Sequence, residues 1–158
     1  MDLGLKGKNA IIVGGARGIG RAAAEILASE GANVAICARD QKNVDQAVAS
    51  LSAKGIKATG AAVDVTDGDA YRAWVTAAGE ELGGIDIFIG MASAGGGVMD
   101  ESGWRANLET DIFGTTRGVV AAMHCNEGRT DYLGCPVEPV TGHRRYPREH
   151  GIPWSNVF

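Results

Sequence analysis

The sequence of 158 residues lacks an apolar run long enough to cross a bilayer, so it predicts no membrane-spanning segment. Its N-terminus lacks the basic start, apolar stretch and small-residue cleavage site of a secretory signal, which predicts a cytoplasmic protein. The three cysteines, Cys37, Cys125 and Cys135, are too few and too scattered for a disulfide framework or a zinc site. We therefore expect reduced thiols and no metal.

Clusters of basic residues are also absent. The chain has 15 Lys and Arg against 19 Asp and Glu, a net charge of -4, and no segment gathers Lys and Arg among aromatic residues. We therefore do not expect a groove that binds nucleic acid. With 45% hydrophobic and 22% charged residues, the composition instead suits one globular domain.

Several residue types are missing from one part of the chain. Proline is absent before Pro136 and histidine before His124, whereas alanine is absent after Ala122 and lysine after Lys57. We therefore predict a folded domain over residues 1–123 and an irregular tail over 124–158, where no periodicity persists. A shifted reading frame is one hypothesis for the break, and a boundary between unlike segments is another. The nucleotide sequence around codon 123 distinguishes them.

Before the break, apolar runs alternate with helical patterns. Strands are predicted at Asn9–Val13, Asn33–Ala38, 57–63 and 85–89. Helices are predicted at Gly18–Ser29, after Asp40 and after Asp67, which can each cap the helix that follows, and over about 100–123. The first helix is predicted to bury Ile19, Ala22, Ala23, Ile26 and Leu27, the second Val44, Ala47, Val48 and Leu51, and the third Tyr71, Trp74, Val75, Ala78 and Leu82. Strands that are apolar throughout indicate a parallel sheet covered on both faces. The pattern predicts an α/β fold, an incomplete Rossmann-type doubly wound sheet of about four strands and four helices.

A glycine-rich turn, Val13-Gly14-Gly15-Ala16-Arg17-Gly18-Ile19-Gly20, joins the first predicted strand to the first helix. Glycines at a helix start let a pyrophosphate approach the backbone and its free N–H groups. The position after a buried strand favours a dinucleotide site over a simple tight turn, which is the alternative.

The turn resembles the T-G-x-x-x-G-I-G motif of the short-chain dehydrogenase/reductases, with Val13 in place of threonine. The matching residues are Gly14, Gly18, Ile19 and Gly20, and Ala16 lies between them. The family pair that holds the adenine is matched by Asp64 and Val65 after the third strand. Of the family's N-N-A-G after the fourth strand, Ala92 remains. The resemblance implies that these residues contact a nicotinamide dinucleotide.

The second strand ends in Ala38 rather than in an acidic residue, and Arg39 follows. An acidic residue there would bind a free ribose 2′-hydroxyl, whereas arginines suit a 2′-phosphate. Arg17 in the glycine turn adds a second guanidinium. We therefore expect NADP rather than NAD, and the alternative is that both arginines are ordinary surface charges.

The residues that perform catalysis in this family are largely missing. The family uses a serine and a Tyr-x-x-x-Lys pair, but Tyr71, Tyr132 and Tyr146 are followed four residues later by Val, Pro and His. Asp111, seven residues after Trp104, occupies the position of the family asparagine. It is the one candidate catalytic residue, and an ordinary polar helix residue is the alternative.

Two function hypotheses follow. The first is an NADP-dependent oxidoreductase that moves hydride to or from an alcohol or carbonyl substrate, with this chain a truncated or frameshifted, inactive form. The second is a non-catalytic NAD(P)-binding module. A methyltransferase is a third possibility, but the G-x-x-x-G-I-G spacing and Arg39 after the second strand argue against it. The family also pairs subunits through the long helix and the next one, and because the second is not evident, we do not expect a stable homo-oligomer.

Overall fold

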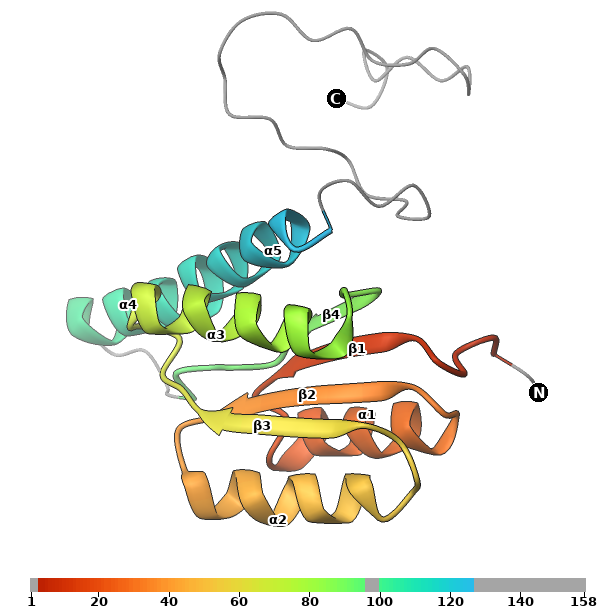
Figure 1. Cartoon of the computed structure of the whole chain (residues 1–158). Coiled ribbons are helices and arrows are strands. Elements are labelled where there is room, and N and C mark those ends of the chain that lie inside the picture. Colours follow the sequence, from red (N-terminus) through yellow and green to blue (C-terminus); the bar gives the residue numbers. More distant parts are fainter. Residues whose placement is uncertain (1–2, 96–99, 127–158) are drawn as a thin grey trace, which may run out of the picture.

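The structure is a computed structural model that describes residues 3–95 and 100–126. Its centre is one parallel sheet in the order β3-β2-β1-β4, made of β1 (Asn9–Val13), β2 (Asn33–Ala38), β3 (Ala58–Ala62) and β4 (Ile87–Gly90). Helices α1 (Gly18–Ser29) and α2 (Gln41–Ser52) cover one face, and α3 (Gly68–Leu82) and α5 (Gly114–His124) cover the other (Figure 1). The predicted doubly wound α/β fold is confirmed.

Both faces of the central strand β1 are buried. Ala10 and Ile12 pack toward α1 and α2, while Ile11 and Val13 pack toward α3 and α5. Because a parallel sheet needs cover on both faces, this continuous apolar run is the pattern expected of its interior. Helices α2 and α3 are capped as predicted, with Asp40 accepting from the Asn43 N–H and Asp67 from the Ala70 N–H.

The buried face predicted for α1 is only partly correct, because Leu27 packs against the core but the fully buried residues of the helix are others. Ile19 is 75% exposed and Ile26 is 60% exposed, whereas Gly20, Ala24 and Ala28 face the core. The physical reason is close packing, since a Cβ on Gly20 would collide with the Gly14 carbonyl oxygen. A helix whose start lies this near the end of β1 has room for small side chains on its inner face, so Ile19 and Ile26 lie outward.

Strand β4 begins at Ile87, two residues later than predicted. Ile85 lies just before β4, and its backbone N–H and carbonyl groups form hydrogen bonds with the side chain of Asn126. The Ile85 N–H donates to Asn126 Oδ1 at 3.1 Å, and Asn126 Nδ2 donates to the Ile85 carbonyl at 2.6 Å. Asn126 is 3% exposed, so these two bonds tie the end of α5 to the start of β4.

The long helix predicted over about 100–123 is present but not uniform. It consists of α4 (Glu101–Asn107), a π-helical segment η1 (Leu108–Phe113) and α5. Such π segments appear mostly as local interruptions of α-helices and often at functional sites. Helix α5 lies very close to α3 and β4 at Gly118, where an added Cβ would collide with Tyr71 and Phe88.

The predicted domain boundary at residue 123 falls within the last turn of α5, and the chain continues in folded form to Asn126. Most of the predicted irregular tail, residues 127–158, lies outside the described residues. In the described part of the chain, no helix combines the length and apolar character that crossing a membrane requires.

Candidate functional site

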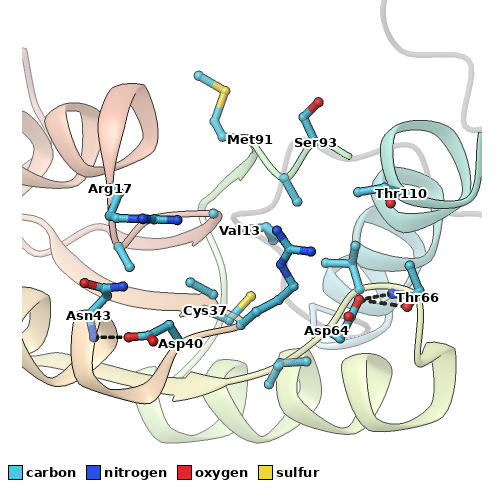
Figure 2. A pocket seen from close by; sticks show the side chains of 17 residues that line it. Val13, Arg17, Cys37, Asp40, Asn43, Asp64, Thr66, Met91, Ser93 and Thr110 are labelled. Carbon is cyan, nitrogen blue, oxygen red and sulfur yellow. Dashed lines mark hydrogen bonds between the residues drawn. The ribbon is translucent and has the colours of Figure 1, made fainter. Parts of the chain in front are cut away.

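A pocket of about 570 Å³ opens at the carboxyl ends of the strands. Its walls come from the β1–α1 turn, the β2–α2 and β3–α3 connections, the segment after β4 and η1. Because ligands of doubly wound sheets bind beyond the carboxyl ends of the strands, this is the expected place for a site. Figure 2 shows the lining residues, which are Val13, Gly14, Ala16, Arg17, Cys37, Ala38, Arg39, Asp40, Asn43, Val63, Asp64, Val65, Thr66, Met91, Ala92, Ser93 and Thr110.

The glycine turn is held against β2. Both Gly14 and Gly15 donate their N–H groups to the Cys37 carbonyl, at 2.8 and 3.3 Å. Gly14 has a φ of +80° and passes so near the segment after β4 that an added Cβ would lie 2.8 Å from the Met91 carbonyl oxygen. Gly18 has a φ of +57°, and an added Cβ there would meet nothing within 4 Å. The turn therefore leaves open space beside the first residue of α1.

The N-terminus of α1 differs from those of the other α-helices that begin near the sheet's carboxyl edge. Its N-cap residue, Arg17, makes no side-chain cap hydrogen bond. Helices α2 and α3 are both capped by an aspartate. Since a helix N-terminus attracts anions, α1 offers N–H groups that Arg17 leaves uncapped beside the pocket.

Charged side chains of both signs line the pocket: Arg17, Arg39, Asp40 and Asp64. Asp64 Oδ1 accepts from the Thr66 N–H at 2.9 Å and from Thr66 Oγ1 at 2.8 Å. These bonds, helped by the positive charge of Arg39, hold the pKa of the Asp64 carboxyl below its usual range. Asp64 is therefore an ionised acceptor at neutral pH.

The segment after β4 is fixed by the π-helical part of the long helix. Asp111 Oδ1 accepts from the Ala94 N–H at 3.2 Å, and the neighbouring Thr110 lines the pocket. Asp111 itself does not line it. Its carboxylate orients the loop next to the site, in addition to any role toward a ligand.

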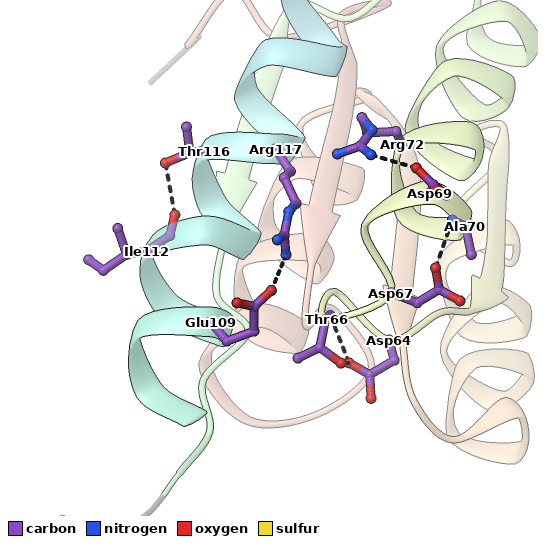
Figure 3. Close-up of polar contacts among 10 residues, drawn as sticks. All are labelled: Asp64, Thr66, Asp67, Asp69, Ala70, Arg72, Glu109, Ile112, Thr116 and Arg117. Atoms are coloured by element: carbon purple, nitrogen blue, oxygen red, sulfur yellow. Dashed lines mark hydrogen bonds and ion pairs between the residues drawn. The ribbon is translucent and has the colours of Figure 1, made fainter. Parts of the chain in front are cut away.

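The ion pair between Glu109 and Arg117 spans the junction of η1 and α5 (Figure 3). The Arg117 guanidinium also lies 5.8 Å from the centre of the Phe113 ring. On the other side, a Cβ on Gly68 would lie 3.1 Å from Arg117 Nε, so the start of α3 packs against this arginine. Arg117 thus joins η1 to the loop that follows Asp64.

The side chains of Tyr71 and Cys37 are too deeply buried to act as an acid, a base or a nucleophile toward a ligand. Tyr71 is fully buried between α3 and α5, and burial raises its pKa. Cys37 is likewise buried, and burial raises the pKa of its thiol to about 12. The Cys37 side chain is therefore an apolar wall at neutral pH. No cluster of His, Cys, Asp or Glu among residues 3–95 and 100–126 could hold a metal ion.

Seven of the site residues predicted from the sequence line this pocket: Gly14, Ala16, Arg17, Arg39, Asp64, Val65 and Ala92. Gly18 and Gly20 shape the turn behind it, while the Ile19 side chain is exposed and is not part of the lining. Sequence reasoning did not assign Val13, Cys37 and Ala38, at the ends of β1 and β2, to the site. Beyond the strands it missed Asp40, Asn43, Val63, Thr66, Met91, Ser93 and Thr110. All but Thr110 follow a strand end closely, and that position is the signal that could have identified them.

Comparison with known proteins gives consistent results. The family model for short chain dehydrogenase matches residues 8–130. The chain is 32% identical over 148 residues to dehydrogenase/reductase SDR family member 4 of Mus musculus, covering 90% of this chain and 53% of the mouse protein. Coverage of 90% extends beyond residue 123, where the composition changes.

Among solved structures, L-sorbose reductase from Gluconobacter frateurii, complexed with NADPH and L-sorbose, has a TM-score of 0.74 and 31% identity over 79% of this chain and 49% of its own. Xylitol dehydrogenase bound to NAD+ has a TM-score of 0.73 and shares the fold at 24% identity, over 77% of this chain and 49% of its own. The chain spans about half the length of these relatives. With the family match over residues 8–130, the chain belongs to the short chain dehydrogenase family.

Proposed function

We propose that the pocket binds NADP and that this chain provides the nucleotide-binding part of an oxidoreductase acting on an alcohol or carbonyl substrate. The observation that carries the proposal is the combination of an open glycine turn, an uncapped α1 N-terminus and two arginines in one pocket. Each of these features favours an anionic, extended ligand.

The residues present fit a dinucleotide. The space beside Gly18, where an added Cβ meets nothing within 4 Å, suits a pyrophosphate at the start of α1. Asp64 and Val65 would hold the adenine, and Ala92 would border the nicotinamide. When bound, the nicotinamide supplies or accepts the hydride.

The end of β2 favours NADP over NAD. Ala38 offers no carboxylate to a ribose 2′-hydroxyl, and the exposed Arg39 follows it in the pocket lining. Arg17 lies in the same lining. A phosphate between two guanidiniums can form charge-assisted hydrogen bonds, which are about twice as strong as neutral ones.

A non-catalytic NAD(P)-binding module is the second candidate, and a specific observation favours it. The sequence contains no Tyr-x-x-x-Lys motif, and Tyr71 is buried in the core. We propose that these 158 residues alone bind the cofactor without turning over a substrate. Turnover of an alcohol or carbonyl panel by the purified chain would contradict this part of the proposal.

Titration with NADPH and NADH, followed by cofactor fluorescence, tests the binding proposal. We expect the chain to bind NADPH more tightly than NADH. Replacing Arg39 by Ala should weaken NADPH binding about tenfold, since a charge-assisted hydrogen bond contributes roughly 1.5–3 kcal/mol, and should leave NADH binding nearly unchanged.

The matched control is Arg72→Ala. Arg72 is an exposed arginine that pairs with Asp69 on α3 and does not line the pocket. Equal affinity for NADPH and NADH, or an equal loss in both arginine variants, would overturn the assignment of NADP. A chain that binds neither nucleotide would overturn the proposed function.

A further inference from the structure

Two segments that are far apart in the sequence form one wall of the pocket. The β3–α3 connection contributes Asp64, Val65 and Thr66, and η1 contributes Thr110. The two segments touch where α5 begins, since a Cβ on Gly114 would lie 3.0 Å from Val65 Cγ2. The width of this part of the pocket therefore depends on how closely η1 and α5 pack against the β3–α3 connection.

Arg117 lies between these two segments (Figure 3). Its guanidinium pairs with Glu109 in η1, and a Cβ on Gly68, the first residue of α3, would lie 3.1 Å from its Nε. Arg117 and Glu109 are eight positions apart, which in a helix is about 12 Å along the axis. The ion pair therefore spans the η1–α5 junction, and the same arginine also contacts the start of α3.

This ion pair differs from the other arginine pairs. Within residues 3–95 and 100–126 the others lie inside single helices, at spacings of three or four: Arg21–Glu25, Arg72–Asp69 and Arg105–Glu101. The Arg117 side chain is 26% exposed, against 48% for Arg72 and 77% for Arg105. Since water and salt screen a partly buried pair less than an exposed one, Arg117 is placed to hold two elements together.

We propose that Arg117 is a positioning residue that holds η1 against the start of α3 and so sets the width of the pocket beside the adenine. The proposal rests on the proposed function, in which Asp64 and Val65 hold the adenine. Arg117 does not line the pocket, so it acts on a ligand through the two segments that it joins. The segment after β4, on the nicotinamide side, is held separately by the hydrogen bond from the Ala94 N–H to Asp111. Loss of the arginine should therefore weaken adenine binding more than nicotinamide binding.

The test uses Arg117→Met in the full chain, which removes the charge and keeps an unbranched side chain. Binding of NADPH, 5′-AMP and reduced nicotinamide mononucleotide is measured for both proteins. We expect the Kd for NADPH and for 5′-AMP to rise about three- to fivefold, and the Kd for reduced nicotinamide mononucleotide to change by less than about 1.5-fold.

Two further variants separate the ion pair from simple packing. Glu109→Gln removes the other partner and should give the same pattern, and the double variant should bind no more weakly than Arg117→Met alone, because both changes break one interaction. Arg117→Lys keeps the positive charge and should retain most of the affinity for 5′-AMP. If Arg117→Met does not fold, Glu109→Gln and Arg117→Lys provide the same comparison.

The matched control is Arg105→Met, which changes an exposed arginine that pairs with Glu101 on α4 and does not line the pocket. It should leave all three Kd values unchanged. An equal loss for 5′-AMP and reduced nicotinamide mononucleotide, the same loss in the control, or additive losses in the double variant would each overturn the role of Arg117 while leaving the proposed function intact. Failure of the unaltered chain to bind any of the three ligands would overturn the proposed function and this inference together.

Discussion

The two ends of the same sheet are built in opposite ways. At the amino ends of the strands, polar side chains bond to the protein itself. Asn9 Nδ2 donates to the Leu82 carbonyl and Asn33 Nδ2 donates to Asn9 Oδ1, both at 3.0 Å, and the Lys57 N–H donates to Asn33 Oδ1 at 3.1 Å. At the carboxyl ends, the glycine turn and the arginines face a pocket.

The difference separates stability from binding. The amino-end bonds connect β1 and β2 to the start of β3 and the end of α3, and Asn9 is 8% exposed. Buried polar groups that lose a partner cost more than exposed ones. We therefore expect changes at the amino end to lower the free energy of unfolding with little effect on ligand affinity, and changes at the carboxyl end to do the reverse.

The largest expected effect is on stability. Replacing Asn9 by Ala removes a donor to Leu82 and an acceptor for Asn33 inside the fold, so the free energy of unfolding should fall by about 2–3 kcal/mol. Urea unfolding measures this, and the NADPH affinity of the folded fraction should not change. Asn43→Ala is the control, because it removes a side-chain amide at the other end of the sheet but keeps the backbone N–H that donates to Asp40. A variant as stable as the unaltered chain would contradict the division between the two ends.

Gly18→Ala tests the carboxyl end. Its φ of +57° makes any other residue cost about 1 kcal/mol of stability, and the new methyl group would project into the open space proposed for the pyrophosphate. The affinities for NADPH and NADH should both fall about tenfold or more. Gly55→Ala is a matched control, since Gly55 has a φ of +80° with nothing within 4 Å and lies outside the pocket lining. Equal affinity losses in the two variants would show strain rather than ligand exclusion.

Asp111 provides a smaller test of the loop after β4. Asp111→Ala leaves the Ala94 N–H without its acceptor, which costs about 1 kcal/mol in loop order, and NADPH affinity should fall about threefold. Asp111→Asn retains an acceptor oxygen and should restore the affinity. If Asp111→Asn binds as weakly as Asp111→Ala, the negative charge rather than the hydrogen bond to Ala94 determines the effect.

The smallest effect is a pH dependence at Asp64. Because the hydrogen bonds from Thr66 lower the pKa of this carboxyl in the folded chain, its ionised form stabilises the fold above about pH 4, and the contribution is lost as the pH falls further. Asp64 is exposed, so the contribution is well below about 1 kcal/mol. The difference in unfolding free energy between the unaltered chain and Asp64→Asn should therefore vanish toward pH 2. A difference that grows with acid would contradict this sign.

The sequence was sufficient for most of the fold because local signals and tertiary packing agree there. Strand β1 and helix α1 have the predicted bounds, and Asp40 and Asp67 cap the helices they were predicted to cap. Apolar residues without interruption and aspartate before a helix are local features, and they need no knowledge of the partner element.

The predictions that failed depend on distance between elements. The inner face of α1 is set by the close approach of Gly20 to Gly14, which no periodicity reveals and which leaves Ile19 and Ile26 outside. Thr110 lines the pocket from the π-helical segment, whose extra residue per turn changes the direction of its side chains relative to an α-helix. The pairing of Asn126 with Ile85 joins positions 41 residues apart, and a pattern within one element cannot predict it.

The contact between Tyr71 and Gly118 has a further consequence. The Tyr71 hydroxyl is buried without a hydrogen-bond partner in the described part of the chain, and it lies so near α5 that a Cβ on Gly118 would collide with it. If α5 turned or slid by one residue, the larger side chain of Arg117 or Val119 would meet this ring instead. The contact therefore restricts the rotation and the register of α5 against α3. Since η1 continues directly into α5, we expect this contact also to hold in place the helical segment from which Thr110 lines the pocket.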